Sequence, residues 1–242
     1  MNIKVILPVT ADIFIDETKE EVEFYASKDT NVSVTALEYG PASIESEYDE
    51  ALALPDFLKK AKEAQEEGYD GIISDCLADP GVSAAREILD IPVVGPGTSA
   101  MHTASMLGNK FSIVTVLPNV VSMLDNLTKT AGLYEKLTSI RYVNIPVLEL
   151  QDKEKLKSGL YSEMKKAIEE DKAHSFVLGC TGFMGVASDL HEKLKKDGYD
   201  VPIIDPMFAA TKMLESFISM GVKQSRLTYM TPPDKERNNP VE

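Results

Sequence analysis

The chain has 242 residues, 43% of them hydrophobic, and its 39 acidic and 25 basic side chains give a formal net charge of −14. Such a chain buries a sizeable core in one large domain or two small ones, and its negative charge repels nucleic acids and anionic membrane surfaces. The opening run MNIKVILP is too short for a signal peptide, and no stretch approaches the roughly 18 apolar residues of a membrane span. We therefore expect a cytoplasmic protein with no nucleic-acid or membrane partner.

Apolar runs rich in Val and Ile predict buried strands along the whole chain. In chain order these runs cover residues 2–8, 31–38, 71–75, 92–95, 111–117, 139–146, 175–179 and 201–204. Segments with apolar residues at i, i+3 and i+4, such as 57–64 and 156–168, lie between the runs and predict helices. Parallel strands need a crossover, which a helix supplies, so the alternation predicts an α/β fold of mainly parallel sheet with helices on both faces.

A weak internal repeat relates residues 68–97 to residues 173–206. Each segment runs through a strand, a cysteine, a glycine-containing turn, a helix and a strand led by proline. The helix of the second segment is longer, so the match is one of topology rather than of sequence. The repeat predicts a molecule of two pseudo-symmetric lobes.

The two cysteines of the chain, Cys76 and Cys180, occupy equivalent places in this repeat, at the carboxyl end of a predicted strand. Ligand clefts of doubly wound sheets lie at that end, and a following helix N-terminus lowers the pKa of a thiol. A single cysteine after a strand is usually a small core residue. Two cysteines at matching positions of a repeat instead indicate a functional pair. We predict that one thiolate removes a proton from a carbon next to a carbonyl and that the other thiol returns a proton to the opposite face.

Backbone amides around Thr181 and Gly182 are expected to stabilise the enolate oxygen that develops in such a reaction. This chemistry requires no cofactor and no metal, and the three histidines lack the spacing of metal ligands. Two turns are rich in glycine, one with Gly179, Gly182 and Gly185 and one with Gly95 and Gly97, and neither has the order of a nucleotide-binding motif. The sequence therefore predicts a cofactor-independent racemase or epimerase, an isomerase acting on a small-molecule substrate.

Six motifs in the same order resemble the hydantoin racemase branch of the aspartate/glutamate racemase superfamily, and the likeness extends to about residue 222. They are GPASIESEYDEALA (40–53), CLADPGVSAARE (76–87), IPVVGPGTSA (91–100), FSIVT (111–115), LGCTG (178–182) and PIIDPMFAATKMLE (202–215). The resemblance implies that Cys76 and Cys180 are catalytic and that the substrate, a hydantoin, allantoin or a related amino-acid derivative, binds between two flavodoxin-like lobes. It also implies a homo-oligomer. The first lobe comprises residues 1–97 and 205–242, and the second comprises 98–204.

The residues expected to contact the substrate are Pro8, Val9, Thr10, Ser43, Asp75, Thr181 and Gly182. Leu7-Pro8-Val9-Thr10 stands where hydantoin and allantoin racemases look like Asn-Pro-Asn-Thr, so two amide side chains are missing. Thr10 and Ser43 either donate hydroxyl hydrogen bonds to the ligand or serve a turn or cap. Asp75 either tunes Cys76 or caps a turn and faces solvent.

Two further residues are expected to be structural. Asp205 is predicted to cap a helix that begins near Pro206, and Arg86 is predicted to pair with a carboxylate.

Other activities on the same fold stay open at this point. LGCT is shared with amino-acid racemases that act on aspartate or glutamate, although the first cysteine lacks the Asn-Thr that usually follows it there. A cis-trans isomerase or a decarboxylase is a further alternative, but decarboxylation needs only one proton donor. A non-catalytic sensor of small molecules is the last, and it predicts two slowly reacting thiols.

Overall fold

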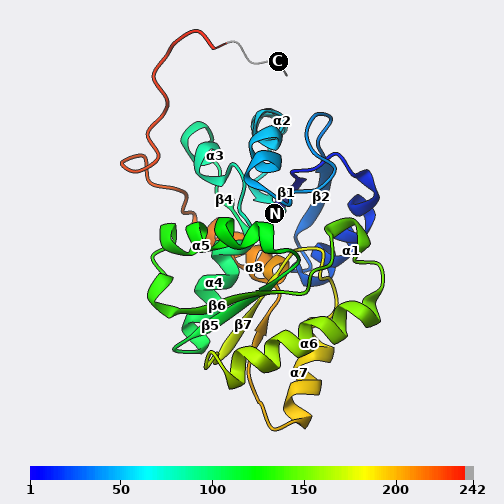
Figure 1. The fold of residues 1–242 in the computed structure, drawn as a ribbon. Coiled ribbons are helices and arrows are strands. Elements are labelled where there is room, and N and C mark those ends of the chain that lie inside the picture. Colours follow the sequence, from blue (N-terminus) through cyan, green and yellow to red (C-terminus); the bar gives the residue numbers. More distant parts are fainter. Residues whose placement is uncertain (238–242) are drawn as a thin grey trace. The chain divides into compact units, whose positions relative to one another are not determined.

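The computed structural model describes residues 1–237, which form two compact units (Figure 1). Unit 1 consists of Met1–Ile44, Tyr48–Gly95 and Ala210–Glu242, and unit 2 consists of Glu45–Glu47 and Pro96–Ala209. The predicted first lobe runs to residue 242, and its residues 238–242 lie outside the described part of the chain. No helix within residues 1–237 is long and apolar enough to cross a membrane.

Unit 1 contains a parallel sheet of four strands in the order β2-β1-β3-β4. The strands are β1 (Asn2–Leu7), β2 (Asn31–Ala36), β3 (Gly71–Ser74) and β4 (Val93–Val94). The helices are α1 (Ile15–Tyr25), α2 (Glu47–Glu66), α3 (Val82–Ile88) and α8 (Pro206–Met220), although Glu47 and the first turn of α8 belong to unit 2. Helix α1 packs on β2, and α3 packs on β4. Leu214 of α8 packs on Gly71, where a Cβ atom would lie 2.6 Å from its Cδ1 atom.

Unit 2 repeats this topology with the strand order β6-β5-β7-β8, again parallel throughout. Its strands are β5 (Phe111–Thr115), β6 (Leu137–Tyr142), β7 (Ser175–Gly179) and β8 (Ile203–Ile204), and its helices are α4 (Pro96–Leu107), α5 (Val121–Thr130), α6 (Lys153–Glu169) and α7 (Ala187–Lys196). Helix α4 packs with α5, and α6 packs beside α7 on the other face (Figure 1). Within residues 1–237, short 3-10 helices lie in the connections of both units: Asp12–Phe14 in unit 1, and Pro118–Val120, Tyr134–Lys136 and Val147–Glu149 in unit 2.

The structure confirms the predicted fold class and all eight predicted strands. The last strand of each unit is shorter than expected, because a proline precedes it and lacks an amide hydrogen for the ladder. The two prolines play the same part: Ile72 N donates to the Pro92 carbonyl at 3.0 Å, and Phe176 N donates to the Pro202 carbonyl at 2.9 Å. The weak repeat in the sequence is therefore a true structural repeat.

A buried carboxylate fastens α8 to the turn between α1 and β2 in unit 1. Glu215 is 5% exposed and accepts hydrogen bonds from Ser27 N at 2.7 Å, Ser27 Oγ at 2.9 Å and Thr30 Oγ1 at 2.6 Å. Burial by itself would raise the pKa of Glu215, but the hydrogen bonds from Thr30, Ser27 and Lys212 outweigh it and lower the pKa to about 2. The ionised carboxylate thus holds the start of β2.

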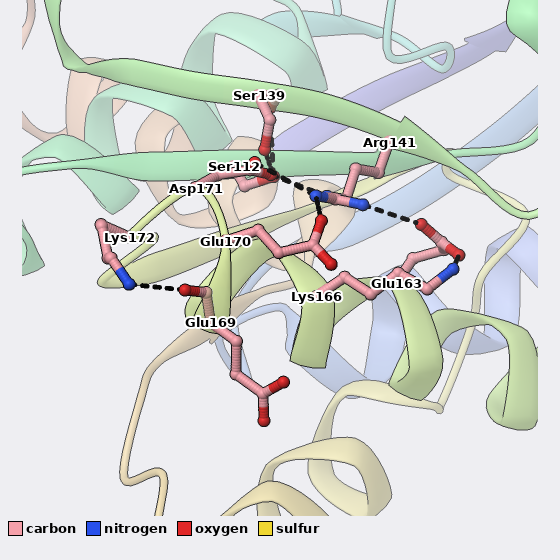
Figure 2. Close-up of polar contacts among 9 residues, drawn as sticks. All are labelled: Ser112, Ser139, Arg141, Glu163, Lys166, Glu169, Glu170, Asp171 and Lys172. Carbon is pink, nitrogen blue, oxygen red and sulfur yellow. Dashed lines mark hydrogen bonds and ion pairs between the residues drawn. The ribbon is translucent and has the colours of Figure 1, made fainter.

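In unit 2 an arginine on the edge strand β6 binds acidic residues at the end of α6 (Figure 2). Arg141 Nε donates to Asp171 at 2.7 Å, and its two Nη atoms reach Glu170 at 2.7 Å and Glu163 at 3.4 Å. Its hydrogen bond lowers the pKa of Asp171, and the acids raise that of Arg141. Since the guanidinium already pairs with these three acids, we infer that the cluster stabilises the fold and does not bind a ligand.

Candidate active site

Each unit has a topological switch point beside its first strand. The chain passes from β1 outward to β2 and then crosses to β3 on the other side, and β5, β6 and β7 follow the same course. Connections leave the carboxyl ends of the two central strands in opposite directions, which opens a crevice for ligands there. Cys76 comes two residues after β3 and Cys180 directly after β7, so both thiols stand at such an edge. Each is a half-buried thiol, not part of a disulfide.

The turns after the two cysteines share one hydrogen bond and one glycine conformation, although Asp79 has a φ of 55° and the equivalent Phe183 has no positive φ. Asp79 N donates to the Cys76 carbonyl at 3.0 Å, and Phe183 N donates to the Cys180 carbonyl at 3.3 Å. Five residues beyond each cysteine stands a glycine with positive φ, 71° at Gly81 and 72° at Gly185, a conformation that other residues rarely adopt. This Cys-x4-Gly spacing is visible in the sequence and would have sharpened the repeat.

A backbone amide points at the sulfur of Cys180. Gly182 N donates to Cys180 Sγ at 3.3 Å, a contact that favours the thiolate over the thiol. The amides of Thr181 and Gly182 are predicted to stabilise an enolate oxygen. In the structure the Gly182 amide donates to the sulfur, and the role of both amides toward a ligand stays a prediction. Helix α7 begins only at Ala187, so the turn rather than the first turn of the helix supplies this donor.

The residue before Cys180 has to be a glycine, because strand β5 passes very close to it. A Cβ atom at Gly179 would lie 2.4 Å from both Thr115 Cα and the Val114 carbonyl oxygen. Thr115 Oγ1 also donates to the Gly179 carbonyl at 2.7 Å, which pins the end of β7. This close approach fixes where Cys180 leaves the sheet.

The equivalent residue before Cys76 is Asp75, whose side chain is buried at 6% exposure. Asp75 N donates to the Ile6 carbonyl at 2.9 Å, extending the β1–β3 ladder, and its carboxylate accepts a hydrogen bond from Thr18 Oγ1 at 3.4 Å. The alternative in which Asp75 caps a turn and faces solvent is therefore wrong. A role in tuning Cys76 stays a prediction.

The end of β1 holds the other expected ligand residues of unit 1. Leu7 is 4% exposed and belongs to the core, whereas Val9 and Thr10 are half-buried and Pro8 is buried. Thr10 N and Thr10 Oγ1 both donate to the Pro41 carbonyl, at 2.8 Å and 3.3 Å. This contact supports the turn role expected for Thr10, and its contact with a ligand stays a prediction.

Ser43, also half-buried, lies two residues beyond Pro41 in the loop from β2 to α2. The structure thus brings the ends of β1 and β3 and this loop to one edge of the sheet in unit 1. Thr181 and Gly182 accompany Cys180 at the matching edge in unit 2.

Two of the structural expectations have opposite outcomes. Asp205 does cap α8, since Phe208 N donates to Asp205 Oδ1 at 3.0 Å. The prediction that Arg86 pairs with a carboxylate is wrong: its Nε atom donates to the Val93 carbonyl at 2.9 Å and its Nη1 atom to Tyr229 Oη at 3.0 Å. The tyrosine comes from the segment after α8, a partner 143 residues away that no local pattern indicates.

No group of three or more His, Cys, Asp or Glu side chains within residues 1–237 is arranged to hold a metal ion.

Known proteins match nearly the whole chain. The sequence profile of the Asp/Glu/Hydantoin racemase family matches residues 3–214. Hydantoin racemases from Pseudomonas sp. (strain NS671) and Paenarthrobacter aurescens are 39% identical over 238 residues and 34% identical over 239 residues, covering 98% of this chain and 94% and 99% of their own lengths. The structure of the allantoin racemase from Klebsiella pneumoniae has a TM-score of 0.92 at 31% identity, covering 100% of this chain and 97% of that chain. These matches confirm the resemblance carried by the motifs, and the chain belongs to the Asp/Glu/hydantoin racemase family.

Proposed function

We propose that this protein is a cofactor-independent racemase of hydantoins or closely related compounds, with Cys76 and Cys180 as its acid and base. The observation that carries the proposal is the equivalence of the two thiols, each following the third strand of a parallel sheet whose four strands have the same order. The family and the curated relatives confirm the predicted isomerase class. Two observations support the assignment of the thiols: each stands at the carboxyl edge of its sheet, and each is followed by a turn with the same hydrogen bond and a glycine at the same place.

The proposed reaction balances without any added reagent. One cysteine, as the thiolate, takes the proton from the carbon next to the carbonyl, and the electron pair of the C–H bond moves toward the carbonyl oxygen as an enolate. The other cysteine, as the thiol, gives its proton to the opposite face of that carbon. The two sulfurs have then exchanged protonation states, and proton exchange with water restores them.

The contact between Gly182 N and Cys180 Sγ supports Cys180 as a base, because an amide donor at 3.3 Å stabilises the sulfur when it is charged. The amide of Thr181 belongs to the same turn and is proposed to face the substrate. Stabilisation of an enolate by preorganised amides is often a large contribution to catalysis.

The end of β1 supports a hydantoin whose substituent on the reacting carbon is apolar. Val9 is half-buried at the carboxyl edge and its side chain offers no hydrogen bond, and Leu7 lies in the core. A polar substituent such as the ureido group of allantoin would lose water there without gaining a partner. We expect a higher kcat/KM for an apolar 5-substituted hydantoin than for allantoin, aspartate or glutamate.

The experiment incubates one enantiomer of each compound with the enzyme in heavy water. Optical rotation should decay while solvent deuterium enters the alpha position, and the Cys76→Ser, Cys180→Ser double variant should do neither. Racemisation that persists in the double variant contradicts the assignment of the thiols. Wild-type enzyme that racemises none of the compounds, with both thiols slow toward iodoacetamide, would favour a non-catalytic sensor.

We also propose that the protein works in the cytoplasm as a homo-oligomer, with no nucleic-acid or membrane partner. The thiol state of both cysteines and the net charge of −14 support this environment and these exclusions. Light scattering after size exclusion tests the assembly, and a mass of one chain contradicts it.

A further inference from the structure

The loop between β2 and α2, residues 37–46, is bound to the end of β1. Leu37 N donates to the Val9 carbonyl at 2.9 Å. Four residues later the loop contacts the end of β1 a second time: the Pro41 carbonyl accepts hydrogen bonds from both the amide and the hydroxyl of Thr10. Loop and strand end therefore fix each other, and Ser43 follows directly.

A buried acid on α2 holds the beginning of the same loop. Asp56 is 1% exposed, and its Oδ2 atom accepts hydrogen bonds from Glu38 N at 2.6 Å and Tyr39 N at 3.1 Å. Burying a carboxylate is costly unless hydrogen bonds compensate, and here the two bonds go to loop amides. One helical turn further along, Lys60 pairs with Glu38 at 3.0 Å.

Between these two attachments the loop lies directly on α2. Gly40 has a φ of 149°, and a Cβ atom there would lie 3.1 Å from Leu37 Cδ1 and 3.6 Å from Ala53 Cα. Before Gly40 are the two amides that donate hydrogen bonds to Asp56. After it is the Pro41 carbonyl, which accepts a hydrogen bond from Thr10. The loop is thus held on one side by Asp56 and on the other by the end of β1.

We propose that Asp56 is a positioning residue for substrate binding, which acts through the β2–α2 loop to hold Thr10 and Ser43 in their binding geometry. The inference rests on the proposed function and on the sequence-based prediction that Thr10 and Ser43 contact the substrate. The carboxylate itself is buried beneath the loop and acts only through the two amides. Without it those amides lose their acceptor and the loop loses its fixed course.

Glu215 provides a matched control in the same unit. It is also a buried carboxylate that accepts a backbone amide, but it holds the turn before β2, at the amino edge of the sheet. Removing either carboxylate leaves buried donors without an acceptor and lowers stability. Only the loss of Asp56 should disturb the carboxyl edge.

The first measurement compares kcat and KM of Asp56→Ala, Asp56→Asn and Glu215→Ala for an apolar 5-substituted hydantoin. Asp56→Ala should raise KM about 10-fold, the effect of losing one or two positioned hydrogen bonds, with kcat changed less than about 3-fold. Asp56→Asn keeps an oxygen acceptor and should raise KM less. Glu215→Ala should lower the melting temperature and leave KM unchanged. Equal KM values in the Asp56 and Glu215 variants would overturn the proposal.

The second measurement does not depend on activity. Hydrogen exchange of the Glu38, Tyr39 and Thr10 amides should be slow in the wild type, faster in Asp56→Ala and unchanged in Glu215→Ala. Unchanged exchange in Asp56→Ala would overturn the positioning role even if the enzyme is active. Absence of racemisation in the wild type, with exchange as expected, would instead count against the proposed function alone.

Discussion

The two cysteine turns differ in chemistry although they share a hydrogen bond and a glycine conformation. Both turns follow the third strand of a four-strand parallel sheet, and both reach a glycine near φ 71° five residues later. Before Cys180 stands a glycine that β5 leaves no room to replace, and Gly182 N donates to the sulfur. Before Cys76 stands a buried acid, Asp75. A duplicated topology therefore fixes where the thiols are, while single residues next to them set how each behaves.

The difference matters for the proposed reaction, in which the two thiols hold different protonation states at any moment. A donor beside Cys180 favours the charged sulfur. We expect the carboxylate of Asp75, the residue before Cys76, to disfavour the charged sulfur there. We expect the resting enzyme to carry the thiolate on Cys180 and the thiol on Cys76. The following predictions test whether the two turns are equivalent in place and unequal in chemistry.

The largest expected effect comes from separating the two thiols. Cys76→Ser and Cys180→Ser should each lower racemisation by about 10²- to 10⁴-fold, the usual contribution of a positioned acid or base. Each variant keeps one base, so it should still exchange the alpha proton of one enantiomer with heavy water, and the two variants should differ in which one. NMR of each enantiomer in heavy water measures this. Both variants exchanging the same enantiomer would contradict two opposed thiols.

A methyl group added before Cys180 should be the most damaging small change in unit 2. Gly179→Ala places a Cβ atom 2.4 Å from the backbone of β5, so strands β5 and β7 must separate, at a cost of about 3 kcal/mol. Gly185→Ala is the matched control, because nothing lies within 4 Å of its Cβ position and only its positive φ is strained. That variant should cost about 1 kcal/mol. Melting temperatures of the two variants give the comparison, and equal losses would contradict the close approach.

The attachment of α8 predicts how unit 1 responds to acid. The pKa of Glu215 is about 2 in the folded chain against 4.5 unperturbed, so its contribution is fully present above pH 4.5 and is lost as the pH falls toward 2. Glu215→Gln should therefore destabilise the protein by on the order of 3 kcal/mol at pH 7, and the gap to the wild type should narrow below pH 4.5. Urea unfolding at pH 6 and pH 3 measures the gap. A constant gap would mean that the charge on Glu215 contributes nothing.

The sequence predicted the parallel strands and the places of both cysteines, because these depend on local runs and on the order of elements. The cap at Asp205 was also predictable, since a capping residue and its helix are neighbours in the chain. The burial of Asp75 was not, because its partner Thr18 is 57 residues away. The amide of Gly182 pointing at Cys180 Sγ depends on the course of one turn, which residue types do not specify.

The smallest effect should be the most direct test of the unequal thiols. Asp75→Asn keeps the shape of the side chain and removes its charge, so Cys76 should ionise more readily and react with iodoacetamide about threefold faster near neutral pH. Cys180 in the same sample is the internal control, and its rate should not change. Mass spectrometry of the labelled peptides separates the two sites. If Cys76 reacts no faster in Asp75→Asn, the carboxylate serves only the packing against Thr18, and the asymmetry rests on the amide at Cys180 alone.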